Sequence, residues 1–345
     1  MQNYSLLTTR RVLWVKLQLE ALWDVCSTDA DIKEALANLP KDLNETYERC
    51  LTRIAGQYKD IASKILGWVC VAAKPFKINQ LREALAINTE NGCLIRENLL
   101  PEQLVLKCCS NLLIQNSDNQ VLLAHYSVRQ FLLNRQIDVQ VFSSRFELSS
   151  AELELGLLCV RHLTSSDYTL ALQPSNIRKN MQIPLSPTAI EKLTEIIPSW
   201  SRSILPKPRT TRISLPQKAS KTSSVMELPS FFEFAKEQWA PLTRGIDRDS
   251  NCYTKFQTLA LEPNLSWRLH PWVPIGHYAG MLGWAIANRH IPLLDLLLGL
   301  RPKPKSDIFD LPLHHYSNLP PLHLASRKGN IKISQLILQE CNPRN

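Results

Sequence analysis

The stretch KILGWVCVAAKPFKINQLREALAI, residues 64–87, decides the fold of the first half of the chain. Its opening part has apolar residues at helical spacing and ends before Pro75, because proline cannot continue a helix. Residues 75–78 then predict a short extended piece, and Asn79 is the expected N-cap of a second helix over 80–87. This order of helix, strand and helix opens a small domain made mainly of helices.

The residues downstream predict one more helix and a hairpin. Residues 101–108 favour a helix with proline in its first turn. NLLIQ (111–115) and QVLLAH (120–125) are short apolar runs on either side of the turn-rich tetrapeptide NSDN, a pattern typical of a β-hairpin. Helix, strand, helix, helix and hairpin is the order of a winged helix, which we expect over residues 41–140.

The residues upstream predict three helices. The run VLWVKLQLEALW, residues 12–23, is rich in large apolar side chains and predicts a mostly buried helix. A second helix covers residues 29–39 and stops at Pro40. A third opens at Asp42, with Glu45 three residues on in a capping-box arrangement. Further helices are expected over residues 58–73, 127–134 and 149–168.

The helix that could read DNA in such a domain lacks the side chains for that role. Sequence-specific helices present Arg, Lys, Asn or Gln to base edges, with basic neighbours on the phosphates. The segment PEQLVLKCC, residues 101–109, offers one basic residue, Lys107, and one acidic residue, Glu102. A packing role between domains is the better interpretation of this helix.

The composition is that of a globular chain with room for two or three domains. The chain has 345 residues, of which 44% are hydrophobic and 21% charged. Ten glycines against 22 prolines argue against phosphate-cradling loops and against a turn-dense β-sandwich. We therefore expect a mainly α fold of short helices with extended connections.

The formal net charge of +9 is concentrated in one segment. No acidic residue lies between Glu195 and Glu227. The basic residues found there are Arg202, Lys207, Arg209, Arg212, Lys218 and Lys221. Residues 201–227 are also rich in serine and proline, which favours a solvated linker. A phosphorylation-tuned docking segment, a nuclear-import signal and weak nucleic-acid binding are the alternatives.

The cysteine pattern indicates a reducing compartment. Nine cysteines are an odd number, and none of them forms a C-x-x-C pair, so neither a zinc site nor a redox motif has its spacing. No run approaches the roughly 18 apolar residues of a membrane span, and the N-terminus lacks a cleavable signal pattern. We expect free thiols, no membrane association and a cytoplasmic location, with the nucleus as the alternative.

Helical segments flank the linker on both sides. Residues 141–200 predict a helical arm, and residues 228–275 a helical connector. The connector contains LPSFFEFAKEQWAPL, whose aromatic residues fall at the spacing of one helical stripe. These residues are Phe231, Phe232, Phe234 and Trp239. Core packing is the first interpretation of this stripe, and a docking surface for a partner helix is the second.

Residues 276–345 contain two copies of a helical repeat. PLHLA, followed by a Gly-Asn turn and a leucine-rich run, fits the ankyrin pattern of two helices around a glycine turn. The motif residues are Pro321, Leu322, His323, Ala325, Gly329 and Leu336. Proline begins the first helix, the histidine can bond neighbouring backbone, the alanine permits close helix approach and the glycine supplies a left-handed turn.

A degenerate copy precedes this one by forty residues. Residues 281–285 align with the first helix, Arg289-His290 with the Gly-Asn turn and residues 296–298 with the leucine run. The histidine position is occupied by Gly283. The usual period is 33 residues, so we expect an enlarged loop over 301–312. Two repeats bury a continuous core poorly, so we expect either a truncated array or a cap provided by the preceding helical arm.

Several segments resemble large fungal NACHT proteins of the STAND type with C-terminal ankyrin repeats. LWVKLQLEAL, IKEALANLPKDLNETYERCLTRI, KILGWVCVAAKPFKINQLREALAI and LAHYSVRQFLL are similar to the part of those proteins that follows the ATPase core. LELGLLCVRHLTSSDY and FFEFAKEQWAPL are similar to their connecting arm. The resemblance covers residues 12–170 and 228–345. It implies a winged helix of the kind named after GPI inositol-deacylase, with residues 1–40 as a helical remnant after the core.

The motifs of the family's nucleotide switch are missing from this sequence. NTP binding needs G-x-x-x-x-G-K-[ST], and no Gly-Lys pair occurs; lipid hydrolysis would need G-x-S-x-G, which is also missing. The resemblance then implies a core upstream of Met1 or a lost one. We expect a non-enzymatic module without cofactor, metal or catalytic residues, which binds a protein partner near Trp284, Arg327 and Lys328. An ATP- or GTP-dependent signalling NTPase is the alternative, and the oligomeric state stays open.

Overall fold

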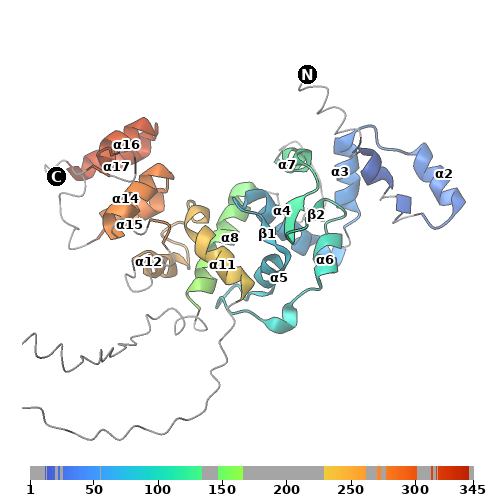
Figure 1. Cartoon of the computed structure of the whole chain (residues 1–345), viewed down its shortest axis with the longest axis horizontal. Helices are drawn as coiled ribbons and strands as arrows, with labels where there is room; N and C mark the ends of the chain where they lie inside the picture. Colours follow the sequence, from blue (N-terminus) through green and yellow to red (C-terminus); the bar gives the residue numbers. More distant parts are fainter. Residues whose placement is uncertain are drawn as a thin grey trace, which may run out of the picture. The chain divides into compact units, whose positions relative to one another are not determined.

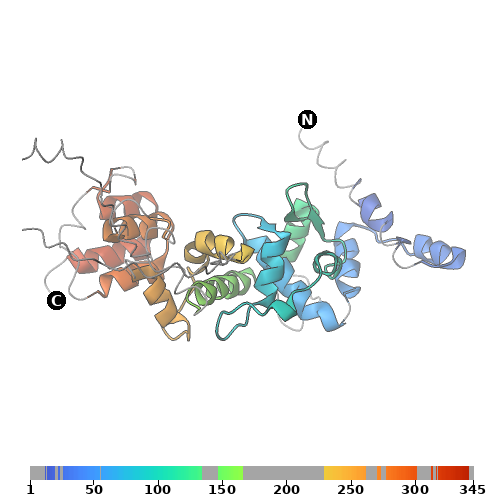
Figure 2. The ribbon, with the colours of Figure 1, turned by 60° about the horizontal axis from the view of Figure 1, so that its bottom comes forward.

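The computed structural model describes most of the chain outside its linker and loops (Figures 1 and 2). The described residues are 12, 14–19, 22, 23, 26–54, 56–133, 147–165, 229–261, 270–272, 277–300, 312, 313, 316 and 318–341. The predicted basic linker over 201–227 and almost all of the predicted loop over 301–312 lie outside them. Within this part of the chain no helix combines the length and the apolar character that crossing a bilayer requires.

The first half of the chain forms a winged helix. Five helices and three short strands follow one another in the predicted order, and the last helix is the one expected over residues 127–134. They are α3 (Leu43–Thr52), α4 (Lys59–Val71), β1 (Phe76–Lys77), α5 (Ile78–Ala86), α6 (Glu102–Lys107), β2 (Leu113–Gln115), β3 (Gln120–Leu123) and α7 (Tyr126–Leu133). The prediction of a mainly α fold with a winged helix and a small hairpin is confirmed.

The small sheet has the order β1-β3-β2, and both pairs are antiparallel. The predicted hairpin pairs Leu113 with Leu123, while the short extended piece adds a third strand through Phe76 opposite Val121. The side chains of Phe76, Leu113 and Val121 are buried. The sheet therefore covers the helices with one apolar face, as alternating strands do.

Side-chain caps explain where two of these helices begin. Asp42 accepts a hydrogen bond from the Glu45 backbone N–H at 2.9 Å, so the predicted N-cap of α3 is confirmed. The prediction that Asn79 caps α5 is wrong, because the helix begins at Ile78. The side chain of Gln80 accepts from the Lys77 N–H at 2.9 Å instead, and the helix therefore opens directly from β1.

The N-terminal helical residues are less buried than predicted. Leu17 is buried, and Gln18 donates to the Thr46 hydroxyl at 3.0 Å, which ties this segment to α3. A row of apolar side chains on the other side is exposed. These side chains are Val12, Val15, Leu19 and Trp23, and Ile32 and Leu36 of α2 (Asp29–Ala37) are exposed as well.

Two antiparallel helices pack side by side after the winged helix (Figure 1). They are α8 (Leu148–Leu163) and α11 (Ser230–Leu242). Gly156 lets them approach closely, since a Cβ at this position would lie 2.5 Å from the Leu242 carbonyl oxygen. Glu147 stands at the N-cap of α8 and makes no side-chain cap hydrogen bond.

The beginning of α11 is held by the winged helix. The Phe231 N–H donates to the Glu83 carboxylate of α5 at 2.6 Å. This hydrogen bond satisfies a backbone amide that has no partner within the first turn of the helix. Phe234 stacks on Phe76 of β1 with ring centroids 4.0 Å apart. These contacts fix α11 to the sheet and to α5.

The aromatic residues of α11 are all buried, which supports core packing over a docking stripe. They serve two different cores, however. Phe231 and Phe234 face the winged helix, whereas Trp239 packs against Phe256 of α12 (Tyr253–Leu261) and against Trp272, with centroids 6.1 and 5.9 Å apart. Helix α11 thus connects the winged helix to the C-terminal part of the chain.

Candidate functional site

The C-terminal part contains two helical hairpins that repeat each other. The first consists of α14 (His277–Ala287) and α15 (Ile291–Leu298), the second of α16 (Pro321–Arg327) and α17 (Ile331–Cys341). Contacts join α14 to α16 and α15 to α17, so the hairpins stack in parallel. Their turns have the same hydrogen bonds forty residues apart: His290 N–H donates to Ala285 O, and Asn330 N–H to Ala325 O.

The two turns share a left-handed residue. Gly329 has φ +65°, and Arg289 has φ +56° at the corresponding position of the first hairpin. An arginine in this region is strained by about 1 kcal/mol relative to glycine. Its guanidinium Nη2 donates to the Lys328 carbonyl oxygen at 2.9 Å. The arginine therefore links the two turns, a role that glycine lacks.

The second helix of each hairpin begins with an equivalent cap. The Asn330 side chain accepts from the Ile333 N–H at 3.1 Å, and His290 Nδ1 accepts from the Leu293 N–H at 3.1 Å. The other ring nitrogen of His290, Nε2, lies 3.2 Å from the hydroxyl of Thr243. His290 is fully buried, and burial lowers its pKa to about 4.

This buried histidine predicts a loss of stability in mild acid. Its folded pKa of about 4 lies below the ordinary value of 6.5, so the unfolded chain binds the extra proton first. The stability that depends on neutral His290 is fully present above about pH 6.5 and is lost as the pH falls towards 4. The loss in the free energy of unfolding amounts to about 3 kcal/mol. We expect His290→Asn, which keeps the cap without titrating, to flatten the pH dependence of urea unfolding between pH 6.5 and 4. Identical profiles for both proteins would contradict this assignment.

The predicted motif residues lie where the helical hairpin needs them, with one exception. Pro321 begins α16, Leu322 and Leu336 are half-buried and Ala325 is fully buried between the helices. His323 is exposed and makes no side-chain hydrogen bond to a described residue, so the expectation that it bonds neighbouring backbone is not met. Gly283, at the same position of the first hairpin, has a different role. A Cβ there would meet the Tyr316 ring at 2.3 Å.

Trp284 does not belong to an interaction surface. It is 9% exposed and packs between Trp272 and His290, with centroids 5.7 and 5.8 Å away. The prediction of a partner contact at this residue is therefore corrected to a core position, because the tryptophan closes the junction between α14 and the connector.

Arg327 and Lys328 do lie on the surface, at the corner where α16 turns into α17. Neither forms an ion pair with a described acidic residue. The exposed Arg289 contacts the same corner through its hydrogen bond to Lys328, and Lys332 is exposed one turn further on. We call Arg289, Arg327, Lys328 and Lys332 the basic corner. Sequence reasoning missed Arg289, although its alignment with the turn glycine pointed to this place.

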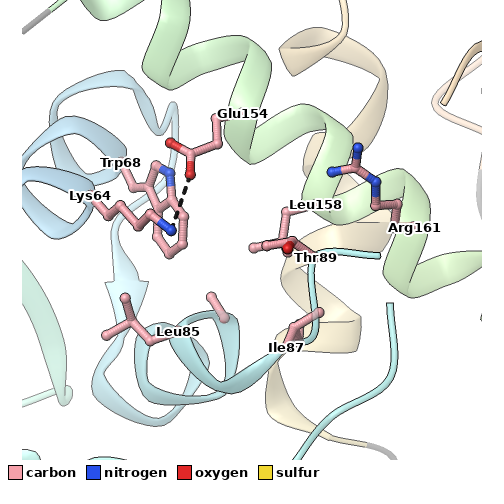
Figure 3. Close-up of a pocket in the computed structure, with 9 residues that line it drawn as sticks. Lys64, Trp68, Leu85, Ile87, Thr89, Glu154, Leu158 and Arg161 are labelled. Carbon is pink, nitrogen blue, oxygen red and sulfur yellow. Dashed lines mark ion pairs between the residues drawn. The ribbon is translucent and has the colours of Figure 1, made fainter. Parts of the chain in front are cut away.

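A small pocket lies between the winged helix and α8 (Figure 3). Its volume is about 350 Å³, including the mouth that opens to solvent. The walls come from α4, α5, the loop after α5, and α8. They are formed by Lys64, Trp68, Ala84, Leu85, Ile87, Thr89, Glu154, Leu158 and Arg161. No sequence motif indicated this pocket, because its residues come from segments up to about a hundred positions apart.

The pKa values of the described cysteines shift in both directions: the hydrogen bond with the Cys109 thiol lowers the pKa of Cys108, whereas burial raises the pKa of others. Eight of them have described side chains, and all eight are free thiols. Burial raises the pKa of Cys70 to about 12 and that of Cys159 still further, so both stay protonated. The described residues also contain no group of three or more His, Cys, Asp or Glu side chains that could hold a metal ion.

Comparison with known proteins finds that part of this chain is similar to a described domain family. Residues 47–143 match the family model "GPI inositol-deacylase, winged helix domain". The azaphilone pigments biosynthesis cluster protein L of Monascus ruber is 35% identical over 139 residues. This alignment covers 37% of the present chain but only 29% of that protein, so the chain spans less than a third of its relative. No solved structure matches the chain.

Proposed function

We propose that this chain is a non-enzymatic interaction module, whose stacked C-terminal hairpins bind an acidic surface of a protein partner. The observation that carries the proposal is the basic corner, where four exposed cations gather on the turn side of two stacked hairpins. Turn tips and exposed faces of helical repeats are common binding surfaces. Unpaired surface cations attract acidic partners and speed their encounter.

The structural elements before the corner would then act as its support. The residues of the basic corner belong to the hairpins formed by α14–α17. These helices are connected to the winged helix through α11 and the aromatic residues around Trp239. We propose that the module belongs to a NACHT-type, ankyrin-containing signalling protein. The winged-helix match and the repeated hairpins support this context. Coupling to an ATP- or GTP-dependent core is the second candidate, favoured by the same match.

The proposal predicts that charge reversal at the basic corner abolishes partner capture. The full chain is immobilised and incubated with a nuclease-treated extract of cells that express it. We expect it to retain partner proteins, and the variant Arg327→Glu/Lys328→Glu to retain at least tenfold less of them. Two repulsive contacts replace two attractive ones, which accounts for an effect of this size. Quantitative mass spectrometry of the retained proteins measures it.

A matched control carries the same charge change elsewhere. Lys33→Glu/Lys255→Glu alters two cations on α2 and α12, outside the basic corner. This control should retain the same partners as the wild type. Equal retention by both double variants, or retention that disappears with nuclease in the wild type, would count against a protein-binding corner.

A further inference from the structure

The second helices of the two stacked hairpins differ in how far their apolar side chains are covered. Positions forty residues apart in α15 and α17 are equivalent, since both helices follow matching turns and caps. Leu298 of α15 is 9% exposed, whereas its equivalent in α17, Leu338, is 51% exposed. Ile291 is half-buried, and its equivalent Ile331 is 74% exposed. The same two apolar positions are therefore covered in the first hairpin and open in the second.

This difference follows from the order of the stack. The first hairpin lies between α12 and the second hairpin (Figure 1), because the Phe256 ring stacks on His290 at its turn while α14 and α15 contact α16 and α17. The second hairpin has α14 and α15 on one side, and Ile331 and Leu338 are exposed. The helix that packs against α15 is α17. Another helix is therefore the shape that fits the exposed side of α17.

The exposed side of α17 combines apolar, amide and basic side chains. Residues three and four positions apart in a helix lie on the same side, and residues seven apart lie two turns above each other. Five exposed residues of α17 follow this spacing, and we call them the open face. They are Ile331, Lys332, Gln335, Leu338 and Gln339.

The charge of the open face favours an acidic occupant. None of its five side chains is acidic, and its one cation, Lys332, also belongs to the basic corner, together with Arg327 and Lys328. A second copy of this chain would bring the same cations towards one another, which disfavours self-association through this face. A helix with carboxylates beside its apolar side chains would match both Lys332 and the apolar pair of Ile331 and Leu338.

We propose that the open face binds an amphipathic, acidic helix of the partner protein, which lies along α17 on the side away from α15. Leucine-like side chains of this helix contact Ile331 and Leu338, and its carboxylates face Lys332 and Lys328. The inference deepens the proposed function and rests on it for the identity of the partner, because Lys332 belongs to both surfaces. The open face contributes the apolar contacts, and the basic corner contributes the charge.

The test uses the purified full chain and a fluorescein-labelled amphipathic peptide as the probe. The peptide carries leucines along one side and glutamates beside them on an alanine-rich background, and it is about 18 residues long because shorter isolated helices are marginal in water. Fluorescence anisotropy should show saturable binding. A peptide of the same composition with its leucines distributed around the helix should bind at least tenfold more weakly. A peptide with lysine in place of glutamate should be weakened equally, since it would meet Lys332 and Lys328 with like charge.

A pair of variants isolates the apolar contacts. Ile331→Ser/Leu338→Ser removes both exposed apolar side chains of the open face and should weaken binding of the probe at least tenfold. Ile32→Ser/Leu36→Ser makes the same kind of change on α2, where these side chains are 40% and 50% exposed, and should bind the probe as the wild type does. All four side chains are exposed, so both variants should keep the fold, which circular dichroism checks.

Several results would overturn the inference. They are unchanged binding in Ile331→Ser/Leu338→Ser, equal binding of the redistributed peptide, and no saturable binding to the wild type. A dimer of the free chain that the serine variant dissociates, measured by sedimentation velocity, would also overturn it, because a second copy would then occupy the open face.

The outcome also separates this inference from the proposed function. If Arg327→Glu/Lys328→Glu loses partner capture while Ile331→Ser/Leu338→Ser binds the probe normally, the basic corner stands without the open face. The reverse pattern would remove the proposed function and leave a helix-binding face without its proposed partner.

Discussion

Replacing Trp239 with alanine should destabilise the protein by about 3–5 kcal/mol, the range for truncating a large buried aromatic residue. Trp239 is fully buried near the end of α11 and packs against Phe256, His270 and Trp272. The truncation removes the centre of the aromatic core that joins α11 and α12 to the helical hairpins. A cavity of this size cannot be filled by small movements of the surrounding rings.

The midpoint of urea unfolding, followed by circular dichroism, measures this effect. Trp23→Ala is the matched control, because Trp23 is 89% exposed and its truncation removes little buried surface. We expect the control to unfold within about 0.5 kcal/mol of the wild type. A Trp239→Ala variant as stable as the control would show that the connector does not depend on this core.

The change Gly156→Ala should cost about 3 kcal/mol, at the upper end of the range for overpacking, although it adds one methyl group. The new Cβ would lie 2.5 Å from the Leu242 carbonyl oxygen and 2.7 Å from its carbon. Backbone atoms cannot rotate away as a side chain can, so α8 and α11 must separate. We expect a lower unfolding midpoint together with faster hydrogen exchange in both helices.

Gly245→Ala provides the control for this substitution. Gly245 lies three residues beyond α11, and a Cβ there meets nothing within 4 Å. The same methyl group should therefore leave stability unchanged or raise it by up to about 1 kcal/mol, since alanine restricts the unfolded chain. If both glycine variants lost the same amount of stability, the close approach of α8 and α11 would not be the reason why position 156 requires glycine.

Local patterns predicted the winged helix well because its signals lie next to each other in the sequence. Pro75 ends one helix, Asp42 caps another, and the turn before Gln120 sets the hairpin. The forty-residue offset between the two hairpins was also visible in the sequence. The structure agrees with it, because the two turns have equivalent hydrogen bonds. The start of α5 was misjudged because Gln80, rather than Asn79, supplies the cap.

The predictions that failed depend on contacts between distant segments. A partner contact was predicted near Trp284, but Trp272 and His290 pack against its ring. The pocket beside Trp68 joins α4 to α8, about ninety residues apart, and sequence spacing carries no sign of it. The sequence alignment placed Arg289 at the turn glycine but did not explain why an arginine occurs there. The structure explains it, because the Arg289 guanidinium donates a hydrogen bond to the Lys328 carbonyl oxygen.

Site-specific photo-crosslinking tests the binding role of the basic corner most directly. The full chain would carry p-benzoylphenylalanine at Lys328 in one variant and at Lys255 in the other, and each would be irradiated in cells that express it. Our account predicts a discrete crosslinked protein with the probe at Lys328 and none with the probe at Lys255. The same product from both positions, or none from Lys328 while the partner is still captured, would contradict it.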